Sequence, residues 1–169
     1  MNHVSQIPDA EALCENLARE LKPHAGAASA MVGIHTGGVW LAERLHAALG
    51  LATPLGALDA ALYRDDYHTQ GLAKDPKRSQ IPFEVEGRPL LLVDDVLYTG
   101  RSVRAALNEL FDYGRPASVT LVVLVDRGGR QLPISAQFCG ARLAIPAGER
   151  LRLKREASGR LRLELERVA

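Results

Sequence analysis

Cysteine is scarce in this chain, and its two copies, Cys14 and Cys139, belong to no Cys-x-x-Cys pair or Cys/His cluster. Two isolated cysteines do not form the ligand set of a structural zinc site, and so few cysteines are typical of proteins in a reducing compartment. There is also no apolar run of transmembrane length, and the first residues include Asp9, Glu11 and Glu15 rather than the basic and apolar segments of a signal peptide. We therefore expect a cytoplasmic protein.

Excess charge of one sign is absent too. A net charge of +1 gives no general attraction to nucleic acid or to a membrane surface, although a local basic patch would still be compatible with it. No internal repeat or low-complexity segment interrupts the chain. At 169 residues it is long enough to bury a full core, and we expect residues 1–169 to form a single domain.

The most informative stretch of the sequence runs from residue 90 to residue 107. Four apolar residues, 90–93, predict a buried parallel strand, and Asp94 and Asp95 follow where that strand is expected to end. Open α/β sheets bind their ligands at this end of their strands. A turn containing Thr99, Gly100 and Ser102 then leads into a helix with apolar periodicity.

This arrangement predicts a site for a phosphorylated sugar. Backbone N–H groups of the turn and the following helix N-terminus would hold the phosphate, with hydroxyl donors from Thr99 and Ser102. Asp94 and Asp95 could bind two vicinal ribose hydroxyls, either by accepting their hydrogen bonds or by coordinating a Mg²⁺ ion that also binds the hydroxyls. The alternative is ordinary helix capping, with an acidic pair that merely solvates the end of a strand.

A second strand, turn and helix of this kind precedes the first. Residues 29–34 form a short apolar strand, His35-Thr36-Gly37-Gly38 follows, and residues 39–49 predict a helix with Gly50 just beyond its end. Because a phosphate-type turn recurs later in the chain, we interpret this turn as a pyrophosphate site. The alternative is a tight connection whose glycines need positive φ.

A third apolar strand, residues 118–125, ends at the polar segment 126–130. If the strands are parallel, the polar residues near positions 35, 94 and 126 meet at one edge of the sheet. We therefore predict an α/β fold with a central, mostly parallel sheet flanked by helices.

The remaining segments frame this sheet. Residues 9–21 predict an amphipathic helix capped by Asp9, and residues 55–63 a further strand. The polar segment 67–82 is either a basic lid over an anionic substrate or a solvated loop; its cationic residues are Lys74, Lys77 and Arg78.

Toward the carboxyl terminus, residues 132–146 are predicted to be an irregular covering segment. In residues 151–156 and 160–165, leucines alternate with charged residues, and Ser158-Gly159 between them are suited to a turn. This pattern predicts an antiparallel hairpin, whose arginines are more simply a solvated face than a nucleic-acid surface.

The chain resembles the PyrR family of pyrimidine-operon regulators and uracil phosphoribosyltransferases, within the type I phosphoribosyltransferases, over nearly its full length. The acidic strand and turn assign only the superfamily, and the shorter matches narrow it to this family. The matching segments are Val32–Thr36, Leu62–Asp66, Leu91–Arg104, Gly114–Pro116 and Leu124–Gly128.

The resemblance implies a type I phosphoribosyltransferase fold with a small hood, at about residues 127–148 with the N-terminal region. It implies transfer of the ribose 5-phosphate group of 5-phosphoribosyl-1-pyrophosphate (PRPP) to uracil, giving UMP and pyrophosphate, with Mg²⁺ held through PRPP, Asp94 and Asp95. In many members it also implies UMP-dependent binding to the leader mRNA of a pyrimidine operon. We expect a homodimer or homotetramer.

The family's functional residues map onto three segments of this sequence. Asp94 and Asp95 act at the ribose, and the 5′-phosphate loop comprises Tyr98, Thr99, Gly100, Arg101 and Ser102. The pyrophosphate loop comprises His35, Thr36, Gly37 and Gly38. The residues expected to border the base are Asp126, Arg127, Arg130 and Phe138.

Three departures from the family pattern affect these expectations. The family's usual Lys-Thr-Arg-Gly loop is His-Thr-Gly-Gly here, at 35–38, so two cationic side chains are missing. In the family's Arg-Gly-His-Arg segment, Gly129 stands in place of the histidine. The family's Asn-Ile-Pro-Thr-Ser segment becomes 143–148 here. The first helix offers Glu15, Asn16 and Arg19 where RNA-binding members carry basic and polar groups.

Two alternatives therefore remain open: a weakly catalytic RNA-binding attenuator, or a purine phosphoribosyltransferase. Purine enzymes of the superfamily carry a carboxylate at the position of Tyr98, which argues against the second alternative.

Overall fold

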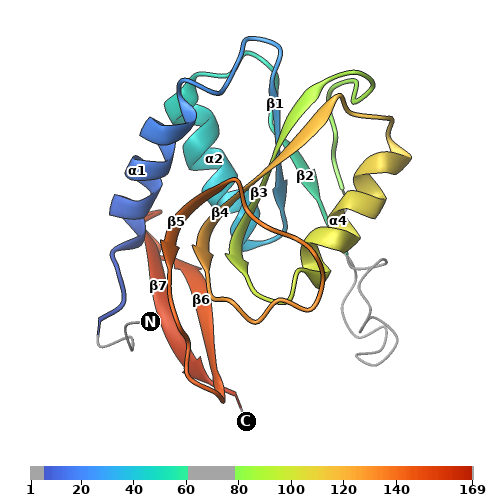
Figure 1. Ribbon diagram of the computed structural model, residues 1–169. Coiled ribbons are helices and arrows are strands. Elements are labelled where there is room, and N and C mark those ends of the chain that lie inside the picture. Colours follow the sequence, from blue (N-terminus) through green and yellow to red (C-terminus); the bar gives the residue numbers. More distant parts are fainter. Residues whose placement is uncertain (1–5, 61–78, 169) are drawn as a thin grey trace.

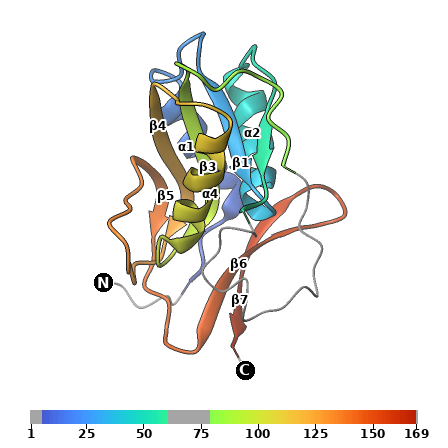
Figure 2. The same ribbon diagram turned by 90° about the vertical axis from the view of Figure 1, so that its right-hand side faces the viewer.

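A five-stranded parallel sheet, in the order β2-β1-β3-β4-β5, forms the centre of the molecule (Figure 1). The computed structural model describes residues 6–60 and 79–168. The strands are β1 (Ala30–Ile34), β2 (Gly56–Leu58), β3 (Pro89–Leu97), β4 (Ser118–Asp126) and β5 (Phe138–Arg142). Helices α1 (Ala10–Leu21) and α2 (Gly37–Leu49) cover one face and α4 (Arg101–Asp112) covers the other (Figures 1 and 2). The predicted fold class is confirmed.

Consecutive residues of the central strands enter two separate cores, because side chains alternate between the faces of a strand. Met31 and Leu91 pack with α1 and α2, whereas Val32 and Leu92 pack with α4. The apolar runs of β1, β3 and β4 are thus the consequence of burial on both faces.

Local signals set the helix boundaries much as predicted. The Asp9 side chain accepts a hydrogen bond from the Glu11 N–H at 3.4 Å, and Gly50 ends α2 with a φ of 61°. Helix α2 begins at Gly37, two residues earlier than predicted, so both loop glycines belong to its first turn. None of the helices in the described part of the chain has the length and apolar character needed to cross a membrane.

The predicted hairpin is also present. Strands β6 (Glu149–Arg155) and β7 (Leu161–Arg167) pair antiparallel, and their inward leucines join the core of α1 and α2. In Figures 1 and 2 the hairpin extends beyond the lower end of the sheet, on the side of α1.

Three predictions about strands need correction. Residues 132–146 are not wholly irregular, because β5 lies within them and pairs in parallel with β4. The strand predicted at 55–63 is assigned only at Gly56–Leu58, and residues 61–63 lie outside the described part of the chain. Strand β3 does not end at the acidic pair. Its pairing with β1 stops at Val93, but its pairing with β4 continues to Leu97.

Candidate functional site

Three strands bring polar residues to one edge of the sheet. Val93 pairs with Gly33 in β1, and Leu97 pairs with Asp126 in β4. Because the strands are parallel, His35, the acidic pair and Asp126 all follow the strands toward the same edge. The predicted meeting of positions 35, 94 and 126 is therefore confirmed.

The first turn of α2 lies against the acidic pair of β3. A side chain at Gly37 would collide with the carboxylate of Asp95, and a Cβ at Gly38 would lie 2.6 Å from the Val93 carbonyl oxygen. Neither glycine has positive φ, so the alternative of a turn that needs positive φ is wrong. The glycines are required by the close approach of helix to strand, and the His35–Thr36 peptide just before them is cis.

Backbone groups orient the two carboxylates. Asp94 is buried, with 7% of its surface exposed, and its Oδ1 accepts a hydrogen bond from the Asp95 N–H at 2.9 Å. The Val96 N–H donates to Asp95 Oδ1 at 2.8 Å. The N-terminus of α2 faces Asp95, and its partial positive charge favours an anion there.

These oxygen donors suit Mg²⁺, which binds hard oxygen ligands. In residues 6–60 and 79–168, however, no group of three or more His, Cys, Asp or Glu side chains is placed to hold a metal ion. Asp94 and Asp95 would therefore be the residues of this edge that fit Mg²⁺.

The predicted phosphate loop connects β3 to α4. Gly100 precedes the helix with a φ of 92°, and the Arg101 N–H donates to Thr99 Oγ1 at 3.2 Å. The Tyr98 side chain is about half exposed, and Ser102 is exposed in the first turn of α4. The loop thus combines backbone amides and hydroxyls at a helix N-terminus, which is a suitable arrangement for an anion.

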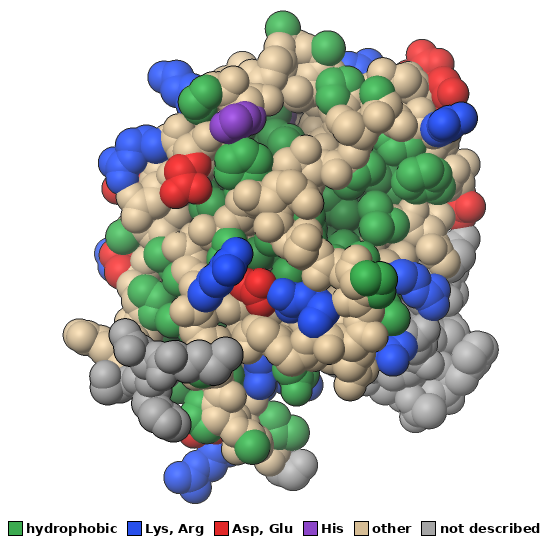
Figure 3. Space-filling view, viewed as in Figure 1, with side chains coloured by type: hydrophobic (Ala, Val, Ile, Leu, Met, Phe, Trp, Pro, Cys, Tyr) green, Lys and Arg blue, Asp and Glu red, His purple; other side chains and the backbone are tan. Residues whose placement is uncertain are grey.

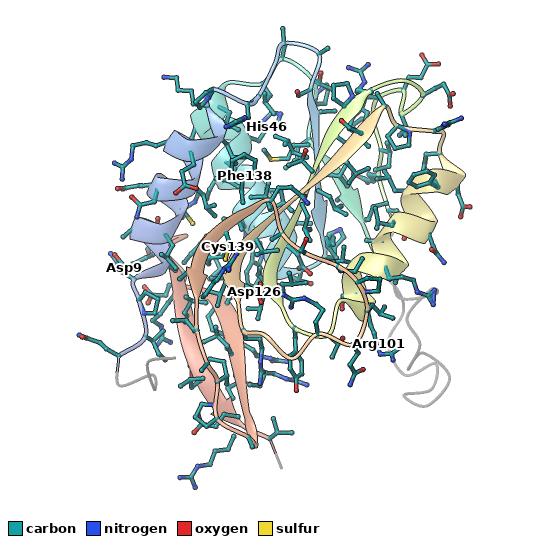
Figure 4. All side chains as sticks on the ribbon, viewed as in Figure 1. Asp9, His46, Arg101, Asp126, Phe138 and Cys139 are labelled. Carbon is teal, nitrogen blue, oxygen red and sulfur yellow. The ribbon has the colours of Figure 1, made fainter. Side chains whose placement is uncertain are left out.

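The segment after β4, residues 127–137, lies along this loop, and we call it the hood segment. The Arg127 guanidinium lies 3.9 Å from the centre of the Tyr98 ring, and a side chain at Gly129 would collide with that ring. Arg130 pairs with Asp126 at 2.6 Å. Figure 3 shows acidic and basic side chains meeting over the lower end of β4, near the position of Asp126 in Figure 4.

The charge of Asp126 is favoured by its neighbours. Burial acts to raise the pKa of Asp126, but hydrogen bonds from Arg130 and the Gly128 N–H and the attraction of Arg130 and Arg142 outweigh it. The pKa of Asp126 therefore lies below its ordinary value, and the carboxylate is ionised near neutral pH.

Phe138 does not join the other residues expected at the base. Its ring centre lies 5.1 Å from that of His24, and it packs in the core beside α1. It pairs with Val122, four positions before Asp126 along β4, and Figure 4 places it well away from Arg101.

The residue of β5 that reaches the site edge is Arg142, which pairs with Asp126 and attracts its carboxylate. Sequence reasoning missed it because β5 was not expected. The short apolar stretch around Cys139 was the only signal for a strand there.

His35 borders a hollow of about 440 Å³ between α2 and β2. The residues that line this hollow are His35, Val39, Glu43, Leu55, Gly56, Ala57 and Gln80. The predicted lid cations Lys74, Lys77 and Arg78, and the segment Leu62–Asp66, lie outside the described residues.

Comparison with protein families agrees with this geometry. Residues 2–143 match the family model described as "Phosphoribosyl transferase domain". A Pseudomonas fluorescens protein named "Bifunctional protein PyrR" is 48% identical over 167 residues, covering 96% of this chain and 98% of that protein. A protein of the same name from Ralstonia nicotianae is 51% identical over 159 residues, covering 92% and 91%.

Solved structures share the fold at low sequence identity. A hypoxanthine-guanine phosphoribosyltransferase of Bacillus anthracis superposes with a TM-score of 0.64 at 17% identity, covering 86% of this chain and 87% of that one. A hypoxanthine phosphoribosyltransferase of Staphylococcus aureus gives a TM-score of 0.61 at 22% identity, covering 82% and 74%. These likenesses show the phosphoribosyltransferase fold expected from the sequence.

Proposed function

The chain belongs to the PyrR family of phosphoribosyltransferase-domain proteins, and on this basis we propose that it transfers the 5-phosphoribosyl group of PRPP to uracil. The products are UMP and pyrophosphate. The observation that carries the proposal is the placement of two candidate anion-binding turns around one acidic pair: α2 begins against Asp95, and the loop at 98–102 follows the strand that carries the pair.

Each part of the edge has a role in this reaction. Asp94 and Asp95 bind the ribose hydroxyls, and residues 98–102 bind the 5′-phosphate. The turn at 35–38 binds the pyrophosphate through backbone amides, since Gly37 and Gly38 supply no side chain. Asp126 and Arg127, the first residue of the hood segment, border the base.

The chemistry needs little covalent help from the protein. N1 of uracil forms a bond to C1 of the ribose while the bond from C1 to the pyrophosphate oxygen breaks, and the N1 proton is released to solvent water. Positive charge develops on the ribose, so the carboxylates of Asp94 and Asp95 stabilise the transition state electrostatically. When bound with PRPP, Mg²⁺ neutralises charge on the leaving pyrophosphate.

No described side chain is assigned as a general base. Tyr98 occupies the position where purine enzymes of the superfamily carry a carboxylate, and a neutral phenol is a poorer proton acceptor than a carboxylate. This residue favours a pyrimidine acceptor over a purine.

A regulatory function is the second candidate. It is favoured by the word "bifunctional" in the names of relatives that match nearly the whole chain. The partner would be the leader mRNA of a pyrimidine operon, with UMP and PRPP as effectors. The exposed Glu15 on α1 opposes it, because a carboxylate repels RNA phosphates.

The acceptor base is tested by supplying PRPP and Mg²⁺ with uracil, hypoxanthine, guanine or xanthine and following pyrophosphate release. We expect turnover with uracil, confirmed by chromatographic detection of UMP, and background rates with the three purines. Release of pyrophosphate with a purine but not with uracil would contradict the proposed acceptor. Release with no base at all would reveal simple PRPP hydrolysis.

A further inference from the structure

One guanidinium group joins three parts of the site. Arg130 Nη2 donates to Asp126 Oδ2 at 2.6 Å, Nη1 donates to the Tyr98 carbonyl oxygen at 2.6 Å, and Nε donates to the Ile134 carbonyl oxygen at 2.8 Å. Arg130 therefore connects the end of β4, the phosphate loop and the far part of the hood segment. Its side chain is 24% exposed and that of Asp126 is 14% exposed, so water competes weakly for the pair.

The hood segment holds the next peptide of the phosphate loop as well. The N–H groups of Gln131 and Leu132 both donate to the Thr99 carbonyl oxygen, at 2.9 and 3.2 Å. Arg101 Nε donates to the Gln131 side chain at 2.9 Å. Two successive carbonyls of the loop, those of Tyr98 and Thr99, are thus turned toward the hood segment.

Peptide geometry fixes where the neighbouring N–H groups point. In a planar trans peptide the N–H points opposite to the C=O of the same unit. With the Tyr98 and Thr99 carbonyls turned toward the hood segment, the N–H groups of Thr99 and Gly100 point to the opposite side of the loop. Within the part of the chain that the structure describes, neither N–H donates a hydrogen bond to another protein group. Successive N–H groups directed to one side form a concave anion site.

We propose that Arg130 is a positioning residue for the 5′-phosphate rather than a contact for the base. It fixes the Tyr98 carbonyl and thereby presents the N–H groups of Thr99 and Gly100 to the phosphate. This inference rests on the proposed function, since it assigns the 5′-phosphate to this loop. It follows that the hood segment must be packed against the phosphate loop for the phosphate to bind.

The test uses ligands that separate the subsites. Binding of ribose 5-phosphate, UMP and pyrophosphate is measured by titration calorimetry for the wild-type protein, Arg130→Gln, Arg130→Lys and the control Arg162→Gln. Arg162 is an exposed residue of the hairpin, and its loss should leave all three affinities unchanged.

For Arg130→Gln we expect about tenfold weaker binding of both ribose 5-phosphate and UMP, and unchanged binding of pyrophosphate. Arg130→Lys keeps the charge opposite Asp126 but cannot hold both carbonyls in the same geometry, so its affinities should be intermediate. If Arg130→Gln fails to fold by circular dichroism, Arg130→Lys alone carries the same comparison of ribose 5-phosphate with pyrophosphate.

A base contact would give a different result: Arg130→Gln would weaken UMP binding and leave ribose 5-phosphate, which has no base, unaffected. That result overturns this inference and leaves the proposed function standing. A wild-type protein that binds neither ribose 5-phosphate nor UMP would overturn the proposed function, and this inference with it.

Discussion

At the scale of single residues, Gly37 determines how closely α2 approaches the acidic pair. It is buried at the start of the helix, and any side chain there would collide with Asp95. The collision is with a carboxylate that the proposed reaction uses, so a substitution should affect activity as well as stability.

We expect Gly37→Ala to lower kcat/KM for PRPP by at least tenfold and the free energy of unfolding by about 1–3 kcal/mol, as overpacking of a buried site does. Steady-state kinetics and urea unfolding provide the measurements. Gly26→Ala is the matched control, because its Cβ would have no neighbour closer than 3.9 Å and its φ is not positive. Wild-type kinetics in Gly37→Ala would show that α2 does not need to lie so close to Asp95.

Gly129 shows a departure from the family pattern with a structural reason. Its φ of 74° favours glycine, and a side chain there would collide with the Tyr98 ring. The same ring lies beneath Arg127. Glycine at position 129 therefore leaves room for the contact of Tyr98 with Arg127, which the sequence alone did not indicate.

At the scale of elements, the strands that could be predicted are those buried on both faces. Strands β1, β3 and β4 lie inside the sheet and carry unbroken apolar runs, so their strand-turn-helix units were recognisable. The turns at 35–38 and 98–102, for which we propose pyrophosphate and phosphate binding, were recognisable for the same reason, because each follows one of these strands.

The edge strands were harder to predict. β2 has only three residues, and every residue of β5 is at least partly exposed. Gly140 lies in the middle of β5, where a Cβ would approach the Leu124 carbonyl oxygen to 2.5 Å. Because the backbones are so close, glycine stands where an apolar side chain would have indicated a strand in the sequence. Missing β5 led to the placement of Phe138 at the base and the omission of Arg142.

The prediction about RNA binding depends on the exposed residues of helix α1. Its exposed face includes Glu15 and Arg19, and the Arg19 guanidinium donates to the Asn16 side chain. We expect binding to a pyrimidine-operon leader hairpin to be absent, or to be steeply salt-dependent and unaffected by UMP. Fluorescence anisotropy at several salt concentrations, with and without UMP, measures this. Tight, UMP-stimulated binding to one defined hairpin would show that the α1 argument is wrong.

At the scale of the whole molecule, the carboxylate of Glu11 ties the hairpin to both helices on its side of the sheet. It accepts hydrogen bonds from the Leu161 N–H and from Arg44, each at 2.7 Å. Burial acts to raise the pKa of Glu11, but the Leu161 N–H, Arg44 and Arg160 outweigh it and hold that pKa below its ordinary value. Leucines of β6 and β7 complete the core beneath this contact.

A lowered folded-state pKa means that Glu11 stabilises the protein above its unfolded-state pKa, about 4.3, and that this stability is lost as pH falls toward the folded-state pKa. We therefore expect Glu11→Gln to lower the free energy of unfolding by about 1–2 kcal/mol at pH 7. The difference from wild type should narrow between pH 5 and pH 3.

Urea unfolding at each pH measures this difference. The exposed Glu20→Gln on the same helix is the control and should change stability by less than about 0.5 kcal/mol. A Glu11→Gln deficit that is equally large at pH 3 and pH 7 would contradict an electrostatic tie.

In the proposed function, the two carboxylates of β3, Asp94 and Asp95, serve a phosphoribosyl transfer site. UMP formation from PRPP and uracil by Asp94→Asn/Asp95→Asn tests it most directly, with Glu164→Gln as a control that removes one carboxylate from the hairpin. We expect the control to retain wild-type turnover and the double variant, shown to be folded by circular dichroism, to form no measurable UMP. Unchanged UMP formation by the double variant would contradict the proposed function.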